Sequence, residues 1–349
     1  MFKFLLYPLS LMYSIPVKIR NILYDLNILK CKYFDKAISI GNITVGGTGK
    51  TPHTEYLASL LQSTYKTAVL SRGYKRKSKG FLYVSENHSY IDVGDEPLQI
   101  AQKFKKITVA VCANRVYAIN KLQTEKKINL TILDDAFQHR KVKPKFSILL
   151  TTYSNPFFKD HLLPFGRLRD NKEEYTRAKI IIITKCPKNI KPIEKTIWKD
   201  NIKLKPFQEL FFSTEKYLPL KKVFTMEKSS FEPKDLKDFS LLLITGIANS
   251  DGFLKYIKEN ISQKVTHLNF GDHHNFTKKD IIQITNVFNE INDLKKIIIT
   301  TEKDAMRLKS YDFQEEFKEK MYFQPIEIEF LFDAKPEFDN KIIELISQN

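Results

Sequence analysis

A glycine-rich run ending in Lys50 and Thr51 constrains the fold of this chain more than any other feature. Its residues Gly46-Gly47-Thr48-Gly49-Lys50-Thr51 match the end of a phosphate-binding loop, in which glycines let backbone N–H groups turn toward a polyphosphate. In such loops the lysine reaches the β- and γ-phosphates and the hydroxyl binds Mg²⁺. The loop joins a strand to a helix, so we expect a strand at 37–40 and a helix at 51–61.

The loop departs from the usual pattern at one position, because Thr44 stands where the first glycine would fall. The neighbouring Gly46 and Gly47 can supply the flexibility instead. The alternative is a glycine-rich turn with a chance lysine. The order of strand, loop, Gly-Lys-Thr and helix favours the nucleotide loop, with Pro52 in the first helical turn, where no N–H is needed.

Short runs of isoleucine, valine and leucine alternate with helical stretches. Runs at 67–70, 130–133, 146–150 and 180–183 predict a buried parallel sheet, and 207–213 reads as an isolated strand. A second alternation has strands at 240–245, 265–270, 297–301 and 325–330 and a closing helix at 337–347. We therefore expect a nucleotide domain at 31–216, a linker at 217–238 and a second α/β domain at 239–349.

The net charge of +17 favours an anionic partner, which nucleic acid, an anionic membrane and a phosphorylated substrate would each satisfy. We see no basic run interleaved with aromatics, so we expect no nucleic-acid partner. The three cysteines lie far apart without metal-binding spacing, which indicates reduced thiols.

The first 30 residues differ from the rest of the chain. Residues 4–17 are apolar but interrupted by prolines and serines, and they are shorter than the roughly 20 residues of a spanning helix. Apolar residues at helical spacing follow over 19–29, with basic residues on other faces. The segment is typical of an interfacial membrane anchor, and a helix packed on the core is an equal alternative.

Several polar clusters could carry chemistry. Asp134 and Asp135 end an apolar strand, where a Walker B acid holds Mg²⁺. Asp95 or Glu96 could act as the base that a phosphoryl-transfer enzyme needs, although a helix-capping turn is the simpler interpretation. Asp272 and His273 follow a strand in the second half of the chain, where an Asp-His pair could tune a base or cap a helix.

These segments, taken in order, resemble the tetraacyldisaccharide 4′-kinases, the lipid A 4′-kinases of Gram-negative bacteria. The ordered set covers nearly the whole chain and is highly specific; its members are 6–10, 20–24, 41–52, 71–74, 94–97, 133–139, 162–164, 272–274 and 301–305. That family also carries a small hydroxylated residue at the position of Thr44. Ala136, Phe165 and Arg167 depart from its commoner residues, with no functional loss that we can see.

The resemblance implies a P-loop NTPase-like three-layer α/β/α fold with a second, smaller α/β domain. It implies transfer of the γ-phosphate of ATP, with Mg²⁺, to the 4′-hydroxyl of an acylated disaccharide 1-phosphate. The enzyme would be peripheral at the cytoplasmic face of the bacterial inner membrane, against its anionic surface. The residue roles carried over are nucleotide binding for Thr44, Gly46, Gly47, Thr48, Gly49, Lys50 and Thr51, metal binding for Thr51 and Asp134, catalysis for Lys50, Asp95, Asp135 and His273, and substrate placement for Glu96, Arg115, Gln138 and His139.

Two other classes remain open from the residues alone. A nucleotide-switch ATPase would use the same loop and hydrolyse ATP without a lipid acceptor. A nucleic-acid-dependent ATPase is suggested only by the charge.

Overall fold

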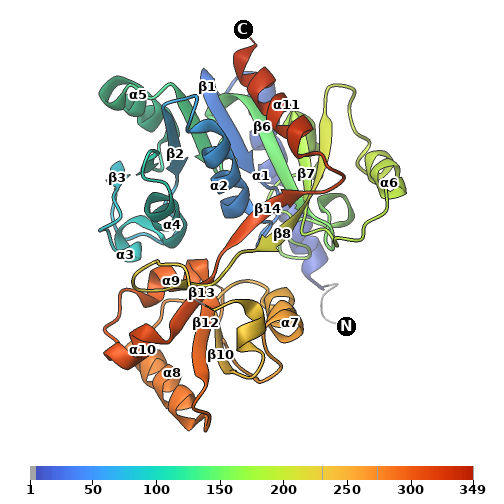
Figure 1. Ribbon diagram of the computed structural model, residues 1–349. Helices are drawn as coiled ribbons and strands as arrows, with labels where there is room; N and C mark the ends of the chain where they lie inside the picture. Colours follow the sequence, from blue (N-terminus) through green and yellow to red (C-terminus); the bar gives the residue numbers. More distant parts are fainter. Residues whose placement is uncertain (1–4, 230, 273, 349) are drawn as a thin grey trace.

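Two mainly parallel sheets organise the chain (Figure 1). The computed structural model describes residues 5–229, 231–272 and 274–348. The first sheet has nine strands in the order β14-β8-β7-β6-β1-β5-β2-β4-β3, and the second has five in the order β11-β10-β12-β13-β9. The strands are β1 Lys32–Gly41, β2 Thr67–Ser71, β3 Leu82–Val84, β4 Thr108–Val111, β5 Leu130–Asp134, β6 Val142–Thr152, β7 Ile180–Thr184, β8 Glu209–Tyr217, β9 Lys221–Lys222, β10 Ser240–Thr245, β11 Val265–Asn269, β12 Lys296–Thr301, β13 Met321–Gln324 and β14 Ile326–Phe330.

The helices lie around these sheets. They are α1 Tyr7–Asp25, α2 Lys50–Leu61, α3 Tyr90–Val93, α4 Asp95–Lys103, α5 Arg115–Lys126, α6 Ile193–Ile202, α7 Asp251–Asn260, α8 Lys278–Glu290, α9 Glu302–Leu308, α10 Glu315–Glu319 and α11 Lys335–Ser347. Helix α4 of the first domain contacts α9 of the second, and Figure 1 shows α9 where the two domains meet.

The central strands β5 and β7 are mostly apolar because both faces of the sheet are covered. Every residue of β5 and β7 is buried, which matches the isoleucine- and leucine-rich runs of the sequence. Burial of one such side chain contributes roughly 1.5–3 kcal/mol. The mixed α/β fold with a second, smaller domain is therefore confirmed.

Two strands lie elsewhere than the sequence predicted. β8 is not isolated, because it pairs in parallel with β7. β14 and α11, which we assigned to the second domain, return to the first: β14 pairs antiparallel with β8, and Phe338 packs in the core of the first sheet. The alternating burial of β14 marks a strand but does not say which sheet it joins.

The N-terminal apolar stretch and the basic stretch after it form one helix, α1, which continues through Pro16. Pro8 lies in its first turn, where it interrupts no hydrogen bond. Among the residues that the structure describes, no helix is long and apolar enough to cross a membrane.

Candidate active site at the carboxyl edge of the first sheet

The glycine-rich loop joins β1 to α2, as the sequence predicted. Gly46 and Gly49 have φ angles of 101° and 82°, which favour glycine because it has no Cβ. The Asn42 side chain donates to Thr48 Oγ1 over 2.7 Å, and Thr184 Oγ1 donates to the Thr48 carbonyl over 3.0 Å. The loop is thus held both from its own start and from the end of β7.

A buried histidine that the sequence analysis did not single out supports the same loop. His53 Nδ1 lies 2.7 Å from the Gly49 carbonyl, and Nε2 lies 3.0 Å from Ser213 Oγ. A carbonyl only accepts, so Nδ1 carries the proton and Nε2 accepts from the serine. Burial lowers the pKa of His53 to about 4, so the ring is neutral at pH 7.

The two carboxylates at the end of β5 have different environments. Thr54 donates to Asp134 Oδ1 over 3.2 Å, while the buried Oδ2 has no hydrogen-bond partner among the described residues. Burial, with repulsion from Glu96 and Asp135, raises the pKa of Asp134 to about 7. An orphaned, buried carboxylate oxygen fits a site that a cation completes.

Asp135, in contrast, already has cationic partners. Arg169 Nη1 donates to its Oδ2 over 3.2 Å, and Lys50 Nζ lies 3.9 Å from the same oxygen. Burial opposes ionisation, but Lys50 and Arg169 outweigh it and lower the pKa of Asp135. The Arg169 guanidinium also donates to Asn42 Oδ1 over 2.5 Å, so it links Asp135 to the start of the loop.

Three residues predicted to place the substrate lie against the loop and its neighbouring strand. Arg115 is buried and donates to the Asp134 carbonyl over 3.3 Å. Gln138 Nε2 donates to the Asn42 carbonyl over 2.6 Å. Burial, with Arg115 nearby, lowers the pKa of His139 to about 4, so its ring is neutral. Their contact with substrate stays a prediction.

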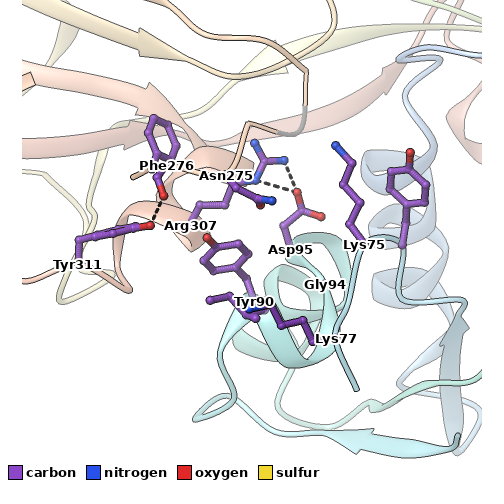
Figure 2. Close-up of a pocket in the computed structure, with 11 residues that line it drawn as sticks. Lys75, Lys77, Tyr90, Gly94, Asp95, Asn275, Phe276, Arg307 and Tyr311 are labelled. Atoms are coloured by element: carbon purple, nitrogen blue, oxygen red, sulfur yellow. Dashed lines mark hydrogen bonds and ion pairs between the residues drawn. The ribbon is translucent and has the colours of Figure 1, made fainter. Parts of the chain in front are cut away.

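Asp95 faces the second domain from the N-terminus of α4 (Figure 2). Arg307 of α9 donates to Asp95 Oδ2 through Nη2 and, over 3.0 Å, through Nε. Lys303 Nζ lies 4.0 Å from the same oxygen and 2.9 Å from Glu96 Oε1. Both predicted acids therefore pair with cations of the second domain. His273, the predicted partner of Asp95, lies outside the described residues.

Lys303 and Arg307 are functional candidates that the sequence analysis missed. The sequence analysis included Lys303 only in the family segment 301–305, without a role, and Arg307 lies one turn farther along. Asp304, which also receives a hydrogen bond from Arg307 over 2.9 Å, is fully buried. Charged residues on successive turns of one short helix were a signal of ion pairs, but Asp95, the partner of Arg307 in the first domain, lies more than 200 positions away.

The described residues contain no group of three or more His, Cys, Asp or Glu side chains that could hold a metal ion. Mg²⁺ in phosphoryl-transfer sites is held by one or two carboxylates together with substrate phosphates. Thr51, which is buried at the start of α2, and Asp134 offer a donor set of that kind.

Comparison with known sequences gives consistent matches over the whole chain. The profile of the tetraacyldisaccharide-1-P 4′-kinase family matches residues 2–347. A tetraacyldisaccharide 4′-kinase from Bacteroides thetaiotaomicron is 44% identical over 355 aligned residues, covering 99% of this chain and 93% of the relative. One from Flavobacterium johnsoniae is 40% identical over 347 residues, covering 99% and 97%.

A solved structure shares the fold. The crystal structure of LpxK from Aquifex aeolicus in complex with ATP has a TM-score of 0.77 to this structure, at 28% sequence identity. The match covers 99% of this chain and 100% of the other. These similarities support a kinase and not the nucleotide switch that the loop alone left open.

Proposed function

This chain belongs to the tetraacyldisaccharide-1-P 4′-kinase family, and on that premise we propose how its site works. It transfers the γ-phosphate of ATP to the 4′-hydroxyl of a tetraacyl glucosamine disaccharide 1-phosphate, a precursor of lipid A. The observation that carries the proposal is that the first domain holds both a phosphate-binding loop before α2 and, where it contacts the second domain, the carboxylate of Asp95. Asp95, at that boundary, is where an acceptor hydroxyl would need a proton acceptor.

The glycine-rich loop and its neighbours would bind the nucleotide. Backbone N–H groups of residues 46–51 would surround the β-phosphate, and Lys50 would meet charge on the transferring group. Thr51 and Asp134 would hold Mg²⁺, whose positive charge stabilises the phosphoryl group in transfer. The orphaned Oδ2 of Asp134 supports this assignment. Asp135 would keep Lys50 and Arg169 in place beside the loop.

Asp95 would take the proton of the acceptor hydroxyl. Arg307 Nε donates to its Oδ2 over 3.0 Å and would hold the carboxylate in position for this role. The pair also joins the two domains, so the approach of the second domain would complete the site. We keep His273 as the predicted second member of this catalytic pair, with Glu96 beside it.

The exposed face of α1 supports attachment to a membrane surface. The helix buries Ser10, Val17 and Asn21, and Asn21 Nδ2 donates to Asp170 Oδ1 over 2.8 Å. Large apolar side chains instead face solvent, with Met12 67%, Ile15 57% and Ile19 52% exposed. An exposed apolar face of this kind fits the interface of a membrane, and we propose that α1 lies on the cytoplasmic face of the inner membrane. That membrane would hold the lipid acceptor.

A single assay separates the kinase from an acceptor-independent ATPase. The protein is incubated with ATP labelled at the γ-phosphate, Mg²⁺ and the acylated disaccharide 1-phosphate. We expect label in the lipid fraction, and only when acceptor is present. Phosphate release at the same rate with and without acceptor would instead identify a nucleotide hydrolase and overturn the proposal.

A further inference from the structure

A buried group of charged side chains lies where two helices of the first domain meet one helix of the second (Figure 1). It consists of Glu55 in α2, Lys103 at the end of α4 and Glu302 at the start of α9. Lys103 Nζ lies 2.5 Å from Glu55 Oε2 and 3.6 Å from Glu302 Oε2. Glu55 and Glu302 are 4% and 7% exposed, so one ammonium lies between two buried carboxylates of different domains.

The contacts of this group within the first domain are hydrogen bonds. Gln99, one turn before Lys103 on α4, donates to Glu55 Oε1 over 2.7 Å. Both carboxylate oxygens of Glu55 therefore accept from α4, which fixes α4 against α2. The contact with the second domain is looser, because the buried Oε2 of Glu302 has no hydrogen-bond partner among the described residues. A small approach of α9 toward Lys103 would complete that bond.

The same three helices carry groups of the proposed active site. Helix α2 begins at Lys50 and α4 at Asp95, and Arg307 of α9 donates to Asp95. Glu55 is five positions after Lys50, and Lys103 is eight positions after Asp95. At 1.5 Å per residue these separations are about 7.5 and 12 Å along the helix axes. The charged group therefore lies behind the reacting groups, where it can set their positions through the helices.

The charges of this group balance only while Lys103 is present. Burial, with repulsion from Glu55, raises the pKa of Glu302 to about 7. Burial also opposes the charge of Lys103, but Glu55 and Glu302 outweigh it and raise the pKa of Lys103. A further cation that acts on Glu302 is Lys221 of β9, whose effect is smaller than that of Lys103. Without Lys103, two buried carboxylates of different domains would repel each other.

We propose that Lys103 is a positioning residue for phosphoryl transfer: its ammonium joins α2 and α4 of the first domain to α9 of the second and so sets the relative places of Lys50 and Asp95. The inference rests on the proposed function and adds to it a residue that acts through these helices. Misplacement of reacting groups by about 1 Å can cost about a hundredfold in rate, so Lys103 can be important without contacting a substrate.

The experiment compares kcat and KM of Lys103→Met and Lys103→Arg with those of Lys106→Met, a matched control that removes an exposed cation just after α4. For Lys103→Met we expect kcat to fall roughly ten- to a hundredfold, while KM for ATP stays within about twofold of wild type because the glycine-rich loop is intact. Lys103→Arg keeps the charge and should retain at least about a third of wild-type kcat, and Lys106→Met should match wild type. Thermal unfolding verifies that each variant is folded, and Lys103→Gln replaces Lys103→Met if the latter is not.

Neutralising Glu302 separates positioning by charge from a loss of packing. Glu302→Gln alone weakens the link between the domains, so kcat should fall severalfold. In the Lys103→Met background the same substitution removes the repulsion between Glu55 and Glu302, so kcat should rise. The ratio of Lys103→Met kcat to wild-type kcat should also decline from pH 6 to pH 8.5, because Glu302 is ionised more fully at the higher pH and then repels Glu55.

Three results would overturn the inference. A folded Lys103→Met enzyme with kcat within about twofold of wild type removes Lys103 from positioning. An equal loss in Lys103→Arg shows that packing and not charge matters at this position. A fall in kcat on Glu302→Gln in both backgrounds shows that Lys103 does not act by balancing that carboxylate. If wild-type protein does not label the acceptor, the proposed function fails and this inference fails with it, whereas normal wild-type transfer with any of the three results overturns this inference alone.

Discussion

Removal of the Lys50 side chain should affect catalysis without affecting the stability of the fold. Its ammonium lies 3.9 Å from Asp135, which keeps its hydrogen bonds from Arg169 when Lys50 is removed. We expect Lys50→Ala to fold normally and to lose about 10²–10³-fold in kcat, since Lys50 would meet charge that develops on the transferring group. Steady-state kinetics beside thermal unfolding check this, and near-normal kcat/KM in the folded variant would end the loop assignment.

His53 should give the protein a specific loss of stability in acid. Its folded pKa of about 4 lies below the ordinary value of 6.5, so the unfolded chain binds a proton in this range that the folded chain does not. The stability that neutral His53 contributes is complete above pH 6.5 and is lost as the pH falls toward 4. From pH 7 to 5 we expect a loss of about 2 kcal/mol from this residue.

Urea unfolding of wild type and His53→Leu at pH 7 and pH 5 measures this loss. Wild type should lose more stability between the two pH values than the variant does, whatever their difference at pH 7. His139, whose pKa is also about 4, is retained in both proteins and contributes equally to each. Equal losses in the two proteins would mean that His53 is not held neutral by the fold.

Among the helices, α1 carries large apolar side chains that are exposed to solvent, and this gives a direct test. Met12→Glu, Ile15→Glu and Ile19→Glu together change only exposed side chains, so the fold should persist while flotation with anionic liposomes falls strongly. Ile282→Glu with Leu294→Glu is the matched control, because these side chains are exposed on the second domain. Undiminished flotation of the triple α1 variant would place the membrane contact elsewhere.

The strands also show what could be predicted from sequence. The isoleucine run of β7 identifies a buried parallel strand, and Gly-Lys-Thr locates the loop, because both signals are local. The pairing of β14 with β8 joins segments far apart in the sequence, so the pattern of β14 predicted a strand but assigned it to the wrong domain.

The site residues show the same limit. Asp95 could be predicted from its own segment, whereas its partner Arg307 could not, because the two are 212 positions apart. His53 lacked any signal, since a lone histidine in a helix is more often only a packed side chain.

Charge pairs across the domain boundary hold the two domains together. Arg307 is 1% exposed and pairs with Asp95 of the first domain and Asp304 of its own helix. Arg307→Leu removes the buried cation that both carboxylates share, while Lys303, 4.0 Å from Asp95, remains. We therefore expect a loss of roughly 3–5 kcal/mol in the free energy of unfolding. Denaturant unfolding of Arg307→Leu checks it, with Lys279→Leu, a substitution of an exposed cation of the second domain, as control. A loss below about 1 kcal/mol would show that the carboxylates find water or other donors.

The account depends most on Asp95 as the group that accepts the proton at the domain boundary. The direct measurement is kcat for Asp95→Asn with ATP and the acylated disaccharide 1-phosphate, beside Asp92→Asn, an exposed carboxylate three positions earlier. We expect kcat of Asp95→Asn to fall by about 10²–10⁴ while ATP affinity barely changes, and Asp92→Asn to match wild type. A folded Asp95→Asn enzyme with normal kcat would contradict the account and leave Glu96 or Asp135 as the base.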